Sequence, residues 1–210
     1  MLIVTLITFT QCNKCKSKKL GYIQLSQTDL NIVPYNGTET LNFKDSIGNT
    51  IQFLGEYSQT QNNPQYENAS SDPDCPGNYY DVEEHSVRFN SALISGHIWL
   101  YMIQYPSFSN EDIQKLLFIT TEYQDTQYWS FNCFFEFYEL KLYNSTSSRG
   151  SILTFNDSLV VGQNKYYSVY TLNQSTAVTG YANLKTLYYS INNGIIGFKT
   201  DQGHLWYLDN

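Results

Sequence analysis

Short apolar and aromatic runs alternate with clusters of turn-forming residues along most of this chain, a pattern that predicts strands joined by hairpins. The strongest turn signal is Asn192-Asn193-Gly194, because Asn-Gly accepts the positive φ angles of a tight hairpin. Ile47-Gly48-Asn49 and Gly162-Gln163-Asn164 also separate runs of strand type. The pattern predicts an all-β chain, with strands expected at residues 40–44, 50–57, 79–90, 96–105, 116–123, 128–143, 152–161, 165–172, 184–191, 195–199 and 204–208.

Apolar residues occupy both alternating sets of positions in the run 184–191, where Tyr188 and Tyr189 are neighbours. Strands that bury both faces suit an antiparallel sandwich or a barrel-like sheet, and the sequence leaves these two architectures open. Ser109-Asn110-Glu111-Asp112 has the form of a capping box and predicts at most one short helix. Residues 58–78 are polar and contain three of the five prolines, so we expect a long loop there.

The first ten residues are predominantly apolar, and Cys12 and a cluster of four lysines follow them. Such a run is too short to span a bilayer as a mature helix, but it suits the apolar stretch of an export signal. We therefore expect an export signal at residues 1–11, lipid attachment at Cys12, a tether over 12–20 and a single β domain over 21–210. The alternative interpretation is the first strand of a protein that is not exported.

The sequence contains 12 basic and 19 acidic residues, for a net charge of −7. Four of the basic residues lie in the expected tether, so the remainder of the chain is more acidic still. A body of this sign repels phosphate backbones, and we expect no nucleic-acid partner. Tyr, Phe and Trp make up 16 % of the residues and favour strands, because flat rings cover a pleated surface well.

The chain has four cysteines. If Cys12 carries lipid and Cys15 lies in the tether, an oxidising compartment favours a disulfide between Cys75 and Cys133. Cys12 and Cys15 also have C-x-x-C spacing, but no second pair completes a zinc site and no βαβ pattern surrounds them. We therefore expect neither a metal nor a cofactor.

Candidate catalytic chemistry is sparse, because no catalytic motif of known spacing occurs. Glu83 and His85 would share one face of a strand, where they could hold a cation, although a solvated charge pair is the simpler interpretation. No catalytic residue is assigned.

The aromatic residues give a better functional signal than the charged ones. Their rings can form a platform for sugars or peptides, and core packing is the alternative role for them. The candidate binding face consists of Trp99, Tyr101, Tyr128 and Trp129.

The last quarter of the chain contains Leu159-Val160-Val161-Gly162, Leu187-Tyr188-Tyr189-Ser190, Gly194-Ile195-Ile196-Gly197-Phe198 and Gly203-His204-Leu205-Trp206-Tyr207-Leu208. Over residues 155–208 this ending resembles that of many uncharacterised all-β outer-membrane lipoproteins of Bacteroidota. The resemblance implies a mature β chain tethered through the cysteine after its signal, and it implies no activity, ligand or catalytic residue. Acidic residues after that cysteine accompany surface display in the group. The lysines found here instead favour the periplasmic face, with the cell surface as the alternative.

Three functional hypotheses fit these observations. The first is a non-enzymatic binding or envelope-assembly module, held at the outer membrane, with an envelope protein or a glycan as its partner. The second is a hydrolase or carbohydrate-active enzyme whose acids converge only in the fold. The third is a structural subunit of an envelope complex. Converging carboxylates or histidines in a pocket would favour the enzyme, and a face or groove without them would favour binding.

Overall fold

The computed structural model describes residues 17–66, 77–91, 96–105, 114–123, 131–138, 141–142, 152–173, 184–200 and 203–209. These residues form one large, mostly antiparallel sheet with one short helix, so the predicted all-β fold is confirmed. No helix in the described ranges is long and apolar enough to cross a membrane. The elements are β1 (Lys19–Ile23), α1 (Gln27–Leu30), β2 (Thr40–Asp45), β3 (Thr50–Tyr66), β4 (Tyr79–Asn90), β5 (Gly96–Tyr105), β6 (Gln114–Tyr123), β7 (Phe131–Tyr138), β8 (Lys141–Leu142), β9 (Ile152–Val161), β10 (Asn164–Asn173), β11 (Leu184–Ser190), β12 (Gly194–Thr200) and β13 (Leu205–Leu208).

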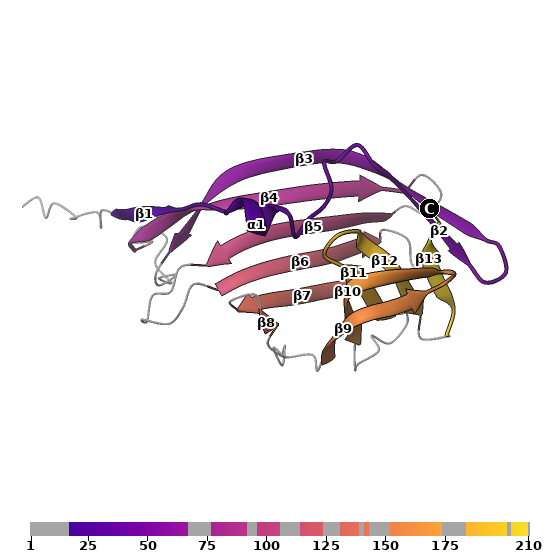
Figure 1. Cartoon of the computed structure of the whole chain (residues 1–210). Coiled ribbons are helices and arrows are strands. Elements are labelled where there is room, and N and C mark those ends of the chain that lie inside the picture. Colours follow the sequence, from indigo (N-terminus) through magenta and orange to yellow (C-terminus); the bar gives the residue numbers. More distant parts are fainter. Residues whose placement is uncertain are drawn as a thin grey trace, which may run out of the picture.

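Strands that follow one another in the chain are mostly neighbours in the sheet. The order runs from β8 back to β2, crosses to β13 and continues back to β9, with antiparallel pairing along the whole path. The crossing places Leu208 opposite Phe43 and so joins the two halves of the sheet at β2 and β13. Outside this path, β1 pairs in parallel with the first residues of β4. Figure 1 shows the half formed by β9–β13 curling round against the half that contains β3–β8.

Both halves of the sheet contribute to one hydrophobic core. Phe43 is fully buried, and its ring lies 6.0 Å from that of Phe53 and 5.2 Å from that of Phe198. Full burial of a side chain of this size contributes roughly 1.5–3 kcal/mol. Because Phe53 and Phe198 belong to opposite halves, this contact holds the curled sheet together. The core also contains Leu25, Ile32, Val33, Tyr35, Leu41, Val87, Phe89, Ile98, Leu100, Met102, Leu117, Tyr170, Leu172, Leu187, Tyr189, Ile195 and Leu208.

The segment between β1 and β2 is packed between the two halves. It contains α1, which begins with a capping box because Ser26 Oγ accepts from Asp29 N while the Asp29 carboxylate accepts from Ser26 N. Beyond α1, the buried Tyr189 hydroxyl donates to Ile32 O at 2.5 Å. The Tyr35 hydroxyl accepts from Ile195 N at 2.6 Å. These contacts from both hairpin strands fix the path of residues 31–36.

A second, smaller cluster covers the other face of β12 and β13. It contains Val161, Tyr166, Val169, Ile196 and Tyr207. Ser168 has a φ of 51°, and the β9–β10 register skips this residue, so the hairpin bends there. The bend brings Gly162 so close to Tyr207 that an added Cβ would lie 2.3 Å from the ring. The C-terminal strands are therefore buried on both faces, as the sequence predicts for 184–191.

The predicted loop over residues 58–78 is wrong for its first half, because β3 continues to Tyr66 and pairs with β4 throughout. Pro64 was the misleading signal. β2 pairs with β3 only as far as Leu54, so the outer edge of β3 is free of strands at Pro64, and the missing N–H breaks no ladder there. Residues 67–76 lie outside the described ranges.

Other boundaries differ from expectation in smaller ways. The strand β1 was not predicted, and the expected strand at 128–143 corresponds to two antiparallel strands, β7 and β8. The helix expected at residues 109–112 falls outside the described ranges. The described helix begins instead after Ser26, where the Ser26 and Asp29 pair provides the same kind of capping signal.

Candidate functional site

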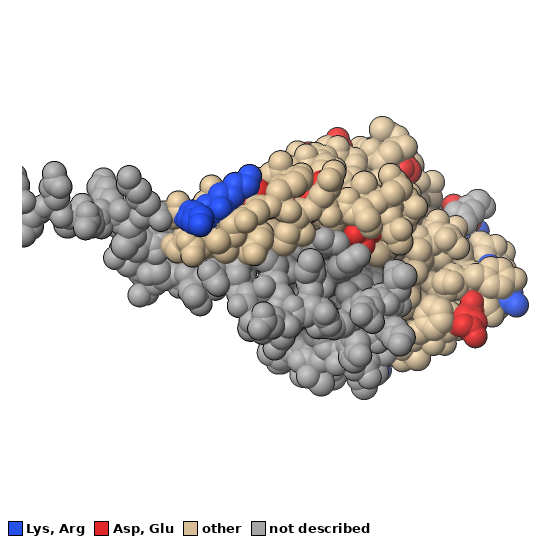
Figure 2. Space-filling view, turned by 60° about the vertical axis from the view of Figure 1, so that its left-hand side comes forward, with Lys and Arg blue, Asp and Glu red and all other residues tan. Residues whose placement is uncertain are grey.

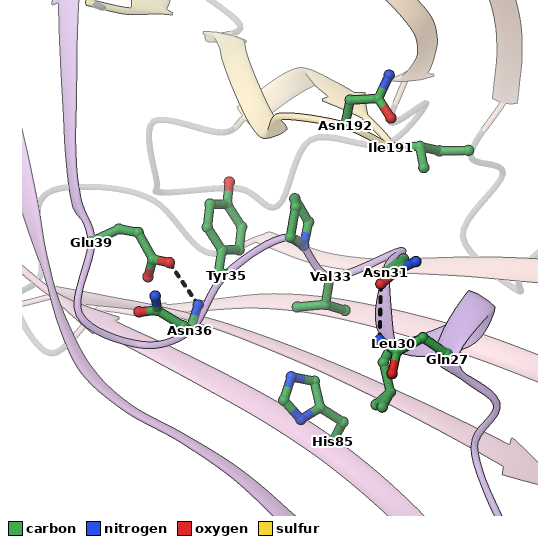
Figure 3. Close-up of a pocket in the computed structure, with 11 residues that line it drawn as sticks. Gln27, Leu30, Asn31, Val33, Tyr35, Asn36, Glu39, His85, Ile191 and Asn192 are labelled. Atoms are coloured by element: carbon green, nitrogen blue, oxygen red, sulfur yellow. Dashed lines mark hydrogen bonds between the residues drawn. The ribbon is translucent and has the colours of Figure 1, made fainter.

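An open pocket lies where the buried segment meets β4 and the turn between β11 and β12. Its volume of about 570 Å³ falls within the range that holds small ligands. In the view of Figure 3, His85 on one side and Ile191 with Asn192 on the other flank the chain at residues 31–36. The lining residues are Gln27, Leu30, Asn31, Val33, Pro34, Tyr35, Asn36, Glu39, His85, Ile191 and Asn192.

His85 contributes the imidazole of the pocket. In β4 it alternates with Val87 and Phe89, which belong to the core, so it lies on the core face of the sheet. Its Nδ1 lies 3.1 Å from Thr60 Oγ1, the register partner in β3. Burial lowers the pKa of His85 from its ordinary value of 6.5, and the nearby negative charge of Glu83 opposes this shift. A neutral imidazole with one nitrogen bound to Thr60 leaves Nε2 for a ligand.

Glu39 is the carboxylate among the residues that line the pocket, and its oxygens are already occupied. They accept hydrogen bonds from Asn36 N at 2.6 Å, Gly37 N at 2.9 Å and Thr38 N at 3.1 Å. Gly37 has a φ of +83°, which lets three successive amides turn towards one side chain. The charge of Glu39 therefore shapes the loop and is poorly placed to act as an acid or a base.

Amide side chains supply most of the remaining polar groups. Gln27 donates to Asn31 Oδ1 at 3.0 Å, and Asn36 Oδ1 accepts from Thr38. These bonds use one end of each amide. Among the described residues, no partner engages Gln27 Oε1, the side-chain nitrogens of Asn31 and Asn36, or the Asn192 amide.

Tyr35 forms the rigid wall of the pocket. Its ring packs edge-on against Phe89 at 5.0 Å, and its hydroxyl, which accepts from Ile195 N, lies 3.4 Å from Asn193 O. Burial raises the pKa of Tyr35 strongly, so this hydroxyl stays protonated. Tyr35 thereby connects the pocket loop to the β11–β12 turn that presents Asn192.

The aromatic residues predicted as a binding face lie on a different surface. Ile98, Leu100 and Met102 of β5 point into the core, so Trp99 and Tyr101 occupy the opposite face, with ring centroids 5.4 Å apart. Tyr101 packs against a small apolar cluster that includes Val82 and Ile103, and Trp99 Nε1 is buried without a hydrogen-bond partner. Tyr128 and Trp129, the other two residues of that prediction, fall outside the described ranges.

The structure brings Glu83 and His85 to the same face of β4, as the alternation predicts. The Tyr22 hydroxyl from β1 donates to Glu83 Oε2 at 3.2 Å and approaches Asn62 Oδ1 at 3.0 Å. Within the described part of the chain, no group of three His, Cys, Asp or Glu side chains is arranged to hold a metal ion. Glu83 serves there as the partner of β1.

The cysteine predictions concern residues at the limits of the description. Cys12 and Cys75 fall outside the described ranges, and the backbone of Cys133 lies in β7 opposite Ile119. The Cys75–Cys133 disulfide stays a prediction. Alkylation of the unreduced protein tests it, because two freely reactive thiols would contradict the bridge.

Sequence reasoning missed most of the pocket. Asn31, Asn36 and Asn192 come from a helix end, a loop and a hairpin turn, where amides are common for purely local reasons. No protein-family model matches the chain, and no curated protein or solved structure is significantly similar to it. The functional assignment therefore depends on the geometry of these residues.

Proposed function

We propose that this chain is a non-enzymatic binding module, exported and tethered to the outer membrane through lipid on Cys12. The domain binds its ligand in the pocket between the buried segment, β4 and the β11–β12 turn. The periplasmic face of the membrane is its expected location. The resemblance of residues 155–208 to tethered β lipoproteins and the leader with Cys12 support the tether.

The observation that carries the binding function is the state of the pocket's polar groups. The carboxylate of Glu39 is saturated by backbone amides, whereas the amide groups of Asn31, Asn36 and Asn192 keep free hydrogen-bonding capacity. A hydrolase would need an acid and a base within reach of the same bond. This pocket instead offers uncharged groups suited to recognition.

The location of basic side chains is consistent with attachment at the N-terminal end. On the face drawn in Figure 2, Lys and Arg gather beside β1, where the described chain begins. Lys19 at this end forms an ion pair with Asp81 of β4. Lysines near a bilayer contribute about 1 kcal/mol each through attraction to anionic headgroups.

A second surface suits an envelope protein. Trp99 and Tyr101 belong to the face of β5 that points away from the core, and Trp99 Nε1 is a buried donor without a partner. Aromatic side chains with a polar end are enriched in protein interfaces. Binding at this surface would make the domain an assembly module as well.

Capture from an envelope extract tests the proposed function. The domain over residues 21–210 serves as bait beside the pocket variant His85→Leu/Asn192→Ala and the control Gln163→Ala, which changes another exposed hairpin turn. We expect the wild type and the control to retain a glycan or protein that the pocket variant loses. Conversion of the captured molecule into cleaved products would instead support the hydrolase.

Cys12→Ala tests the tether. The domain should stay folded but move from the membrane fraction to the soluble fraction, because acyl chains supply the anchoring energy. Membrane fractionation and mass measurement of the native amino end give the readout. Unchanged fractionation, or an intact leader without an acyl group, would contradict the tether and leave the binding site untouched.

A further inference from the structure

The charges around the pocket exclude most charged ligands. None of the described residues that line it is a Lys or Arg, so a phosphate or carboxylate would find no counter-charge there. The Glu39 carboxylate is held by three backbone amides and has little capacity left for a cation. The net charge of the chain, −7, further disfavours anions. The ligand that fits is uncharged.

The unused hydrogen-bonding groups exclude a purely apolar ligand. Asn31 and Asn36 each keep a donor, Gln27 keeps an acceptor, and Asn192 keeps both. The Nε2 atom of His85 adds a further group, because Thr60 occupies only Nδ1. Covering these groups with hydrocarbon would remove water without replacing its hydrogen bonds, which costs about 1–3 kcal/mol for each group.

The apolar walls of the pocket have a matching role. Leu30, Pro34 and Ile191 stand between the amide groups and are each partly exposed. Such surfaces pack against C–H groups, so the pocket suits a ligand that alternates C–H patches with polar groups. A sugar ring has this character, since hydroxyls line its rim and C–H bonds form its faces.

Resting on the pocket of the proposed function, we propose that its ligand is the end of a neutral saccharide. Each sugar hydroxyl is both a donor and an acceptor, which is what a mixed set of amide groups and an imidazole requires. An uncharged peptide is the competing class, but peptides of this kind bind along free strand edges or apolar grooves. The strand that supplies His85 is paired with β3 on one edge and β5 on the other.

Titration with defined sugars tests the proposal. The probes are neutral mono-, di- and trisaccharides built from glucose, galactose, mannose or N-acetylglucosamine, with sialyllactose as the anionic probe and tri-alanine amide as the peptide probe. Saturation-transfer NMR detects weak binding, and calorimetry measures the affinity. We expect at least one neutral saccharide to bind and both other probes to fail.

The variants locate the binding. Asn192→Ala should weaken the saccharide about two- to tenfold, the range expected for one lost hydrogen bond. His85→Leu should weaken it similarly, while His85→Gln, which keeps a donor in place of Nε2, should retain more affinity. Gln163→Ala should bind as the wild type does.

Three results would overturn the proposal. They are binding of no neutral saccharide in the panel, preference for the anionic or peptide probe, and saccharide binding that survives both His85→Leu and Asn192→Ala. The capture experiment separates these results from the proposed function. A pocket-dependent protein partner, found together with no saccharide binding, would preserve the binding module and reject only the ligand class.

Discussion

The two halves of the sheet differ in how many of their faces are buried. In the C-terminal half, β12 is covered on one side by the main core and on the other by the cluster of Val161, Tyr166 and Tyr207. In the N-terminal half, the far part of the β3–β4 hairpin is polar and largely exposed on β3. Only the second half leaves room for a pocket beside His85.

The difference teaches how a scaffold and a site can share one sheet. Strands buried on both faces lose flexibility because packed side chains constrain them from two sides. The β11–β12 turn therefore presents Asn192 from a rigid support, and Tyr35 transmits that position to the pocket loop. Sites held on such supports keep their geometry better than sites on unsupported loops.

Phe43→Ala should break the comparison most severely, because Phe43 joins the two halves at their seam. Its loss removes contacts with Phe53 and Phe198 and should lower the free energy of unfolding by about 3–5 kcal/mol. Urea unfolding measures the change. Ile47→Ala, at a residue that is 76 % exposed, should shift it by less than about 0.5 kcal/mol. Equal effects would show that the halves do not depend on this contact.

Gly162→Ala tests whether the second cluster really stabilises the C-terminal half. The new Cβ would meet the Tyr207 ring, whereas Gly48→Ala, also at positive φ, would meet nothing within 4 Å. Both variants should suffer backbone strain, and Gly162→Ala should lose roughly 1–3 kcal/mol more because the cluster must repack. Thermal unfolding of the pair gives the difference. Similar losses would mean that the hairpin packs loosely against Tyr207.

Tyr35→Phe tests the link between the pocket loop and the turn. The change leaves the Ile195 N–H buried without its acceptor and should cost about 1–3 kcal/mol. Amide exchange should also accelerate at Ile195 without global loss of protection. The control Tyr167→Phe alters a ring that is 60 % exposed and should leave both measurements unchanged. Unchanged exchange at Ile195 in Tyr35→Phe would reject the link.

The smallest effect concerns pH and the half that holds the pocket. Burial lowers the pKa of His85 below 6.5, so on acidification the unfolded chain takes up this proton before the folded one does. The free energy of unfolding should therefore decrease as pH falls below about 6.5 and should keep decreasing until the folded protein protonates. Comparing wild type with His85→Gln at pH 7.5 and 5.0 isolates this contribution. Parallel pH dependence in the two proteins would contradict it.

The predictability of the two halves follows from the same difference in burial. The strands at 152–161, 184–191 and 195–199 were predicted closely, because apolar residues and turn signals such as Asn193-Gly194 agree there. The extension of β3 to Tyr66 was missed because polar side chains and Pro64 resemble a loop. In that stretch backbone pairing with β4, and not hydrophobic burial, holds the strand.

The candidate site was less predictable than the fold. Strand alternation placed Glu83 and His85 on one face, but nothing local indicated that Asn36 and Asn192 would line the same pocket, since 156 positions separate them in the sequence. Trp99 and Tyr101 do share a surface, as predicted. Long-range convergence depends on how the sheet curls, which no short pattern encodes.

The sequence by itself determined the strand content, the turns and which strands bury two faces, because these follow from side-chain periodicity and local φ preferences. Only the tertiary structure decided that β2 and β13 meet, that residues 25–35 fill the curl and that a pocket opens beside His85. The physical reason is range. Periodicity acts over neighbouring residues, whereas the pairing of two distant strands is chosen by the burial of the whole core.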